Sequence, residues 1–203
     1  MRLRKVVDGN VRNSRKRIPK PPTVAVPTAA GGGFQIKRYH RKNYFESEIA
    51  ASLRMLEAER KDFMWFRVPD TNMASMIDNR IILVKAPSDF VVVFGGRPYL
   101  IECKSQSRNL ASYSLKYIRD HQLEYLLKVE ECGGRGWFLL NDRSTNPITA
   151  HALHPQVVDE WRRSMQSVKW KAIKEVGVEL PRFHVDGKAR WDLHRLFCMI
   201  KVV

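Results

Sequence analysis

A short hairpin in the middle of the chain constrains the fold more than any other feature of the sequence. Residues 90–94 form a compact apolar run, and a second apolar run at 98–103 follows the turn signal Gly95-Gly96. Two apolar runs joined by a glycine turn are typical of a β-hairpin. Both runs are apolar enough to be buried inside a sheet, so we expect this hairpin to lie at its centre.

Polar residues interrupt this apolar hairpin at two points. Asp89 comes directly before the first strand, and Glu102 and Lys104 share one face of the second strand, because successive side chains of a strand alternate. Two carboxylates held close together form a hard oxygen site suited to Mg²⁺ or Mn²⁺, and a neighbouring ammonium can steady a phosphate or an attacking water. The alternative is a structural Glu-Lys pair at the edge of a strand.

A helix is expected over 114–131, ended by Gly133-Gly134. Its apolar stripe consists of Leu115, Ile118, Leu126 and Val129. Helical spacing puts Gln122 within this stripe, where burying an unpaired amide would cost about 1–3 kcal/mol. Gln122 therefore either points at a metal-bound water or a phosphate, or is a core glutamine bonded to backbone.

These motifs resemble those of the PD-(D/E)XK nuclease superfamily, with 87–89 as the first half of the signature and 102–104 as the second. Together with 114–126 and the glycines before 137–140, they are similar to the RecU-type and archaeal Hjc-type Holliday junction resolvases. The resemblance covers about residues 43–141, and the VRR-NUC nucleases share the D…ExK…Q order. It implies an α/β restriction-endonuclease-like core: a helix, a mixed sheet with a central hairpin, a helix and a strand.

The resemblance also implies a role for each polar residue of the motifs. Asp89, Glu102 and the backbone carbonyl of Cys103 would hold Mg²⁺, for which Mn²⁺ can substitute. Lys104 would orient the nucleophile, with support from Gln122. The implied reaction is hydrolysis of a DNA phosphodiester by in-line attack of water.

Nucleases of this type also carry a glutamate on the helix before the sheet, and residues 44–59 are expected to form that helix. Glu46 lies at the border of its apolar face, whereas Glu48 points nearly away. The resemblance therefore assigns the family role, assistance to a second metal, to Glu46. Asn43 and Glu46 also match a capping box, and both roles can hold at once.

The chain departs from the RecU pattern in two places. Pro87-Ser88 precedes the aspartate where that family usually has hydroxyl residues, and the segment 68–84 leaves little room for a protruding stalk. Besides a Holliday junction resolvase, two other functions therefore stay open. One is a repair, restriction or end-processing nuclease, and the other is a non-catalytic DNA-binding module.

The net charge of +15 and the isoelectric point near 10.0 favour nucleic acid as the partner, because neutralising phosphates releases counterions. Residues 1–43 are rich in Lys, Arg, Pro and Gly and predict a flexible basic arm that wraps DNA, or else a solubilising or partner-binding tail. The expected DNA contacts are Lys37, Arg38, Arg41, Lys42, Lys85 and Ser88.

The 203 residues are expected to form a basic arm (1–43), a nuclease core (44–141) and an α-rich C-terminal extension packed on that core (142–203). No apolar run suits a membrane span and no signal-peptide core is present, so we expect a cytoplasmic, DNA-associated protein of a prokaryote or virus. The three cysteines suit reduced thiols. Because a resolvase cuts two strands symmetrically, the resemblance implies a homodimer acting on four-way junctions.

Overall fold

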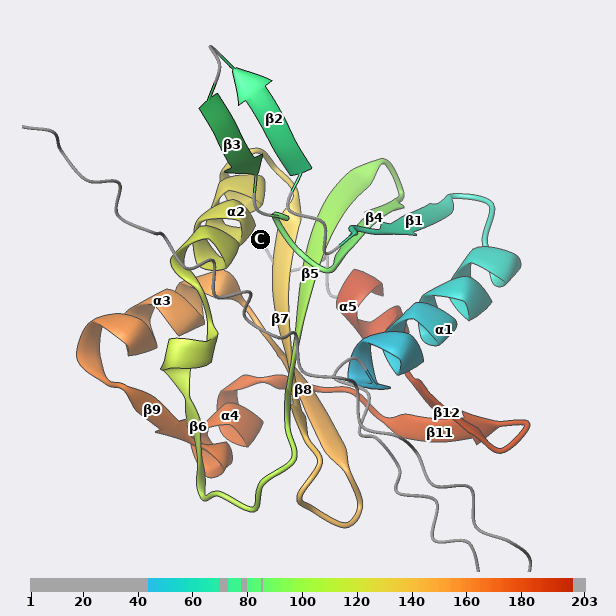
Figure 1. The fold of residues 1–203 in the computed structure, drawn as a ribbon. Helices are drawn as coiled ribbons and strands as arrows, with labels where there is room; N and C mark the ends of the chain where they lie inside the picture. The colour runs from blue at the N-terminus through green and yellow to red at the C-terminus, as the bar shows by residue number, and fades with distance from the viewer. Residues whose placement is uncertain (1–43, 70–72, 78–79, 85, 199–203) are drawn as a thin grey trace, which may run out of the picture. The chain divides into compact units, whose positions relative to one another are not determined.

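A six-stranded mixed sheet of order β1-β4-β5-β7-β8-β10 forms the centre of the fold (Figure 1). The computed structural model describes residues 44–69, 73–77, 80–84 and 86–198, with backbone only for the two short ranges. The β5–β7 pair is parallel and the other neighbours are antiparallel. The strands are β1 (Phe63–Arg67), β4 (Phe90–Phe94), β5 (Arg97–Gln106), β7 (Arg135–Asp142), β8 (Thr149–Leu153) and β10 (Val178–Glu179).

The β4–β5 pair is the hairpin predicted from the glycine turn. Phe94 pairs with Arg97, and the two residues between them, Gly95 and Gly96, have φ angles of 56° and 76°. Positive φ at both central residues is the turn geometry whose twist matches that of paired strands, and glycine reaches it without steric cost. The central hairpin and the mixed sheet are therefore confirmed.

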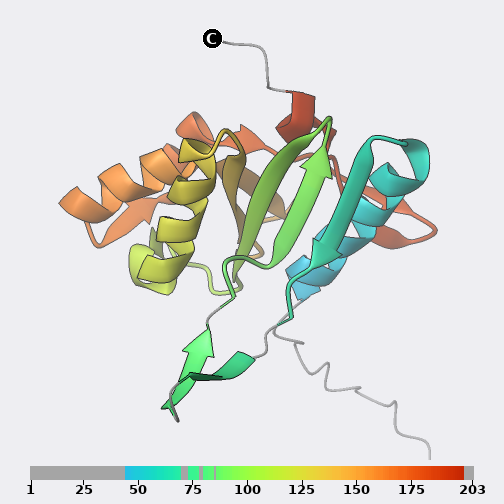
Figure 2. The same ribbon diagram turned by 90° about the horizontal axis from the view of Figure 1, so that it is seen from above.

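Helices cover both faces of the sheet (Figure 2). On one side lie α1 (Tyr44–Glu59), α5 (His194–Cys198) and the hairpin of β11 (Arg182–Val185) and β12 (Lys188–Trp191). On the other side lie α2 (Asp120–Glu131), α3 (Pro155–Ser164) and α4 (Trp170–Val176). Within the described part of the chain, no helix combines the length and apolar character needed to cross a membrane.

Alternation along the central strands supplies a hydrophobic core to each face. Tyr99 and Ile101 of β5 pack into the cluster on the α1 side, as does Trp137 of β7. The next residue of β7, Phe138, belongs to the cluster on the α2 side with Leu126. Because both faces are covered, the central strands are mostly apolar on both faces, and Glu102 is one of a few buried polar residues on them.

The helix expected over 114–131 begins later than predicted, at Asp120 of α2. The preceding residues form β6 (Ser112–Ser114), which pairs with β9 (Ser167–Lys169), and a single 3₁₀ turn, η1 (Leu115–Tyr117). The amide of Leu115 donates to the carbonyl of Gln166, so tertiary pairing with a distant strand replaces the helical hydrogen bonds here. The apolar spacing typical of a helix therefore extends over residues 114–119, although these residues are not part of α2.

The expected α-rich C-terminal extension is wrong. Residues after Asn141 complete β7, contribute β8 and β10 to the central sheet and form the β11–β12 hairpin as well as three short helices. In β8, Leu153 pairs with Phe138 of β7, and both are buried. This segment is therefore part of the sheet and of its core.

The segment before β4 and the three cysteines were also subjects of sequence expectations. The segment before β4, expected to leave little room for a stalk, contains an antiparallel hairpin of β2 (Met73–Ile77) and β3 (Arg80–Val84), which pairs with no strand of the central sheet. All three cysteines are free: Cys103 is buried, and Cys132 and Cys198 are exposed.

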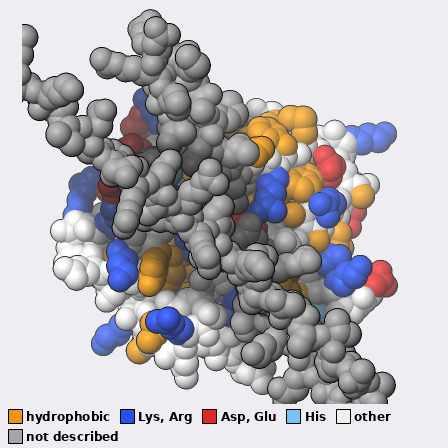
Figure 3. All heavy atoms as spheres, viewed as in Figure 1, with side chains coloured by type: hydrophobic (Ala, Val, Ile, Leu, Met, Phe, Trp, Pro, Cys, Tyr) orange, Lys and Arg blue, Asp and Glu red, His pale blue; other side chains and the backbone are white. Residues whose placement is uncertain are grey.

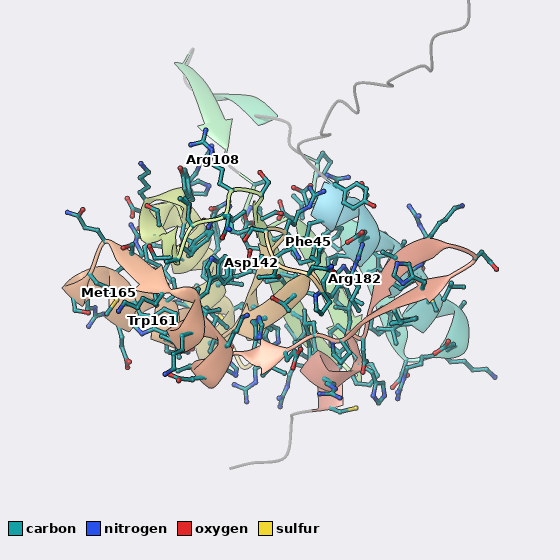
Figure 4. The ribbon with its side chains drawn as sticks, turned by 90° about the horizontal axis from the view of Figure 1, so that it is seen from below. Phe45, Arg108, Asp142, Trp161, Met165 and Arg182 are labelled. Atoms are coloured by element: carbon teal, nitrogen blue, oxygen red, sulfur yellow. The ribbon has the colours of Figure 1, made fainter. Side chains whose placement is uncertain are left out.

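A buried polar contact fixes the β11–β12 hairpin to α1. Glu48, expected to point away from the core, is buried and accepts hydrogen bonds from Arg182 Nη2 (3.1 Å) and Trp191 Nε1 (2.9 Å). Ser52 Oγ accepts a further bond from the Trp191 amide at 2.9 Å. Figure 4 shows Arg182 reaching from the hairpin toward this helix. The contact holds α1, and with it Glu46, against the sheet.

Glu48→Ala should lower the free energy of unfolding by about 3 kcal/mol, because it leaves a partly buried guanidinium and a buried indole N–H without their acceptor. Glu57 offers a matched control, since it accepts a bond from Trp65 Nε1 at the surface (3.0 Å). Glu57→Ala should cost less than about 1 kcal/mol. Urea denaturation measures both values, and equal losses would contradict the role assigned to Glu48.

Candidate active site

The candidate site forms where the β4–β5 ladder ends. Phe90, the first residue of β4, pairs with Ile101, and the amide of Asp89 donates to the Ile101 carbonyl at 3.1 Å. Beyond this point β5 continues without β4. The Asp89 carboxylate takes the place of the missing strand and accepts the amide of Cys103 at 2.7 Å, which fixes Asp89 beside Glu102.

Glu102 is 2% exposed and receives two donors on a single carboxylate oxygen. Its Oε1 accepts hydrogen bonds from Lys104 Nζ (2.6 Å) and Gln122 Nε2 (2.5 Å). The other end of the Gln122 amide, Oε1, accepts the backbone amide of Arg119 at 3.2 Å. Gln122 thus joins the start of α2 to the site, and it bonds both to backbone and to a residue of the site.

The surroundings of Glu102 disfavour the ionised form of its carboxyl. Burial raises the pKa of its carboxyl to about 7, and the neighbouring Asp89 and Glu46 add to the increase, while Lys104 opposes it. Burial also raises the pKa of the Tyr113 phenol, with a further contribution from Glu102. The ionised form of Glu102 is therefore disfavoured in this site, chiefly by burial.

Glu46 of α1 lies close enough to contribute to this effect. Its carboxylate accepts a hydrogen bond from Arg67 at 2.5 Å, and its charge contributes to the raised pKa of Glu102. The alternative role of Glu46, in a capping box with Asn43, concerns a residue outside the described ranges. Arg67 was not expected from the sequence, because only the pairing of β1 with β4 brings it to this position.

The donors present fit a hard divalent cation. Among the described residues, no three His, Cys, Asp or Glu side chains form a ready metal-binding cluster. Mg²⁺, however, commonly takes one or two carboxylates and keeps several waters. Both hydrogen bonds of Glu102 are made by Oε1, and no described residue bonds its Oε2. A cation bound by this oxygen and Asp89 would favour the ionised form of Glu102.

Only the main-chain carbonyl of Cys103, and not its thiol, suits the expected role of a metal ligand. Its side chain belongs to the cluster on the α1 side, opposite to Glu102, and burial raises the pKa of the thiol well above its usual range. The thiol is therefore protonated and unsuited to binding a metal. The carbonyl role of Cys103 stays a prediction.

Most of the residues expected to contact DNA lie outside the described part of the chain. Lys37, Arg38, Arg41, Lys42 and Lys85 lie outside the described residues. Ser88 is 2% exposed, and its hydroxyl donates to the Phe90 carbonyl at 3.0 Å, so this side chain stabilises the turn before β4. Burial does not favour the expected DNA contact by Ser88. Figure 3 shows Lys and Arg side chains spread over the visible described surface.

The site also contains residues that sequence patterns did not identify. Tyr113 lies close enough to Glu102 for the two charges to interact, and Arg119 supplies the amide that orients Gln122. Tyr113 belongs to no motif, and Arg119 lies within the motif segment 114–126 but had no role assigned to it. Trp170 is 6% exposed and belongs to the core on the α2 side.

Comparison with known proteins finds similarity at the level of structure. No family model matches the chain, and no curated protein matches it. A similar solved structure is that of Hjc from Archaeoglobus fulgidus, a Holliday junction resolvase from an archaeal hyperthermophile. The match has 16% sequence identity and a TM-score of 0.38, and covers 64% of this chain and 94% of that chain. At this level it adds no support to an activity, which depends on the residues of the site.

The raised pKa of Glu102 predicts how stability depends on pH in the metal-free protein. Its carboxyl binds a proton more tightly when folded (pKa about 7) than when unfolded (about 4.5), so stability falls as the pH rises between these values. The loss attributable to Glu102 is about 3 kcal/mol. Glu102→Gln should remove it, so the variant should gain stability relative to wild type above about pH 7.

Urea denaturation at a series of pH values, with a chelator present, measures this difference. Glu124→Gln, an exposed substitution on α2, serves as the control and should follow the wild type at every pH. Added Mg²⁺ should stabilise the wild type at high pH and leave Glu102→Gln unchanged. A constant difference between Glu102→Gln and wild type across the pH range would contradict the assigned burial.

Proposed function

We propose that this chain is a Mg²⁺-dependent endodeoxyribonuclease that cuts branched DNA, and specifically a Holliday junction resolvase. The observation that carries the nuclease assignment is the convergence of Asp89, Glu102, Lys104 and Gln122 at the end of the β4–β5 ladder, with two carboxylates side by side and an ammonium on one of them. A buried arrangement of this kind has no stabilising role that an apolar residue would not fill better.

Asp89 and Glu102 would hold the metal together with the Cys103 carbonyl, and Glu46 would assist a second ion. When bound, the metal polarises the scissile phosphate and favours ionisation of an attacking water. Mn²⁺ would substitute for Mg²⁺, because both take oxygen ligands.

Lys104 supplies the fixed positive charge beside the reacting phosphate. Its ammonium lies 2.6 Å from Glu102 Oε1, and the side chain is only 16% exposed, so the charge is held in place before any substrate binds. There it orients the nucleophile and offsets the negative charge that develops during attack. Gln122 restricts the Glu102 carboxylate, since its amide is held at both ends.

DNA is the substrate supported by charge and by the sequence motifs. A net charge of +15 gives the protein a strong attraction for phosphates, whereas the site itself is acidic. The roles proposed for Lys37, Arg38, Arg41, Lys42 and Lys85 rest on this charge. The preference for a four-way junction, and the homodimer that symmetric cutting requires, rest on the resemblance of the motifs to the resolvases.

Asp89→Asn and Glu102→Gln should each abolish Mg²⁺-dependent cleavage while leaving DNA affinity nearly intact, because binding and metal chemistry use different residues. Lys104→Ala should lower turnover about 10²–10³-fold with a smaller effect on affinity. Lys128→Ala removes an exposed lysine of α2 that is paired with Glu131 and should cut like the wild type. Retained cleavage by both carboxylate variants would refute the assigned centre.

A resolvase should bind a four-way junction more tightly than linear duplex of equal length and cut it at paired, symmetry-related positions near the branch. Two active sites fixed by a dimer axis engage two scissile phosphates only when the DNA has matching symmetry. Gel mobility and cleavage assays on both substrates at one salt concentration measure this preference. Equal cutting of linear duplex would leave a repair, restriction or end-processing nuclease.

A further inference from the structure

A hollow of about 410 Å³ adjoins the catalytic lysine on the side of β6 and η1. Its volume falls within the range of about 300–1,000 Å³ that is usual for small-molecule sites. The described residues around it include basic, polar and aromatic side chains but no Asp or Glu. Those that matter to the argument are Lys104, Gln106, Arg108, Leu110, Tyr113 and Tyr117.

Tyr117 gives this hollow an aromatic surface. The side chain is 56% exposed, although its ring is packed against the buried Tyr113 with 6.2 Å between centroids. Tyr113 in turn contacts the ring of Trp170, which is also buried, at 5.9 Å. Tyr117 is thus a fixed and accessible ring, which is the kind of surface on which a nucleobase stacks.

Hydrogen bonds hold the loop between β5 and β6 that forms the opposite wall. The buried Gln106 donates from Nε2 to the carbonyls of Arg108 and Ser112, each at 3.4 Å. The amide of Trp170 donates to the carbonyl of Ala111 at 3.1 Å. The hollow is therefore largely formed before anything binds, which reduces the ordering that binding requires.

Positive charge surrounds the aromatic surface. Lys104 lines the hollow from β5, and Lys116 Nζ lies 5.4 Å from the Tyr117 ring centroid. Arg108 is exposed, and no hydrogen bond or ion pair joins its guanidinium to another described residue. A basic rim around an aromatic ring complements a nucleotide, whose phosphate is anionic and whose base is flat and aromatic.

We propose that this hollow receives one unstacked base of a DNA strand whose neighbouring phosphate lies at Lys104. The base stacks on Tyr117 and Arg108 contacts the adjoining backbone. This inference rests on the proposed nuclease function and deepens it, because a base inside an intact duplex is paired and stacked and cannot enter. The preferred substrate is therefore DNA in which a base next to the scissile phosphate can leave its pair, as at the branch point of a junction.

Tyr117→Ala tests the stacking directly. With a chelator present to prevent cutting, this variant should bind a dye-labelled single strand about 5- to 100-fold more weakly than wild type, and bind duplex of equal length and sequence unchanged. Tyr117→Phe keeps the ring and should bind like the wild type. Tyr125→Ala is the matched control, since Tyr125 is 42% exposed on α2 away from the hollow.

Two further readouts accompany the affinities. A fluorescent adenine analogue in the single strand should be quenched by wild type and by Tyr117→Phe, and not by Tyr117→Ala. Arg108→Ala should reduce the log-log salt slope of single-strand binding by about 0.7, the value for one phosphate contact. Thermal unfolding of each variant verifies that it is folded.

Equal single-strand affinity of Tyr117→Ala and wild type, or equal losses on single strand and duplex, would overturn the inference. Cleavage by the wild type with Mg²⁺ is measured separately. Absence of cleavage on every substrate would refute the nuclease function, whereas cleavage combined with Tyr117-independent binding would refute only the base-binding hollow.

Discussion

The hydrogen bond from the Cys103 amide to the Asp89 carboxylate is the contact on which the rest of the candidate site depends. The paired part of β5 ends at Ile101, opposite the first residue of β4, and β5 continues beyond it. There a side chain completes the hydrogen bonding that a strand would otherwise supply. The carboxylate is consequently fixed beside Glu102. If β4 began earlier, backbone would cover this amide and Asp89 would have no fixed position near the second carboxylate.

The arrangement places a destabilising charge in the interior, and the surrounding structure has to compensate for it. Glu102 is surrounded by a hydrophobic layer on the α2 side, and its two donors come from its own strand and from α2. On the other side of the sheet, Glu48 fixes α1 to the β11–β12 hairpin and thereby positions Glu46. The interactions that stabilise the fold thus lie mainly away from those that would perform the chemistry.

In the proposed function, affinity for DNA and reactivity toward it would be separated in the same way. The protein is strongly basic as a whole, whereas its candidate centre is acidic and partly enclosed. On this proposal the basic surface would attract phosphates generally, and only a strand that reaches the part of β5 beyond β4 would meet Asp89 and Glu102. The aromatic hollow beside Lys104 would add the requirement for shape that we propose, which charge alone does not provide.

The sequence by itself determined the hairpin, the helix at 44–59 and the proximity of Asp89, Glu102 and Lys104, because turn glycines and alternating apolar residues act between neighbours in the chain. It did not determine where α2 begins, that the C-terminal segment joins the sheet, or that Tyr117 lies by the site. Those features depend on pairings such as β6 with β9 and β7 with β8, in which distant segments supply hydrogen bonds and apolar surface that local periodicity does not encode. Only the tertiary structure decided between these partners.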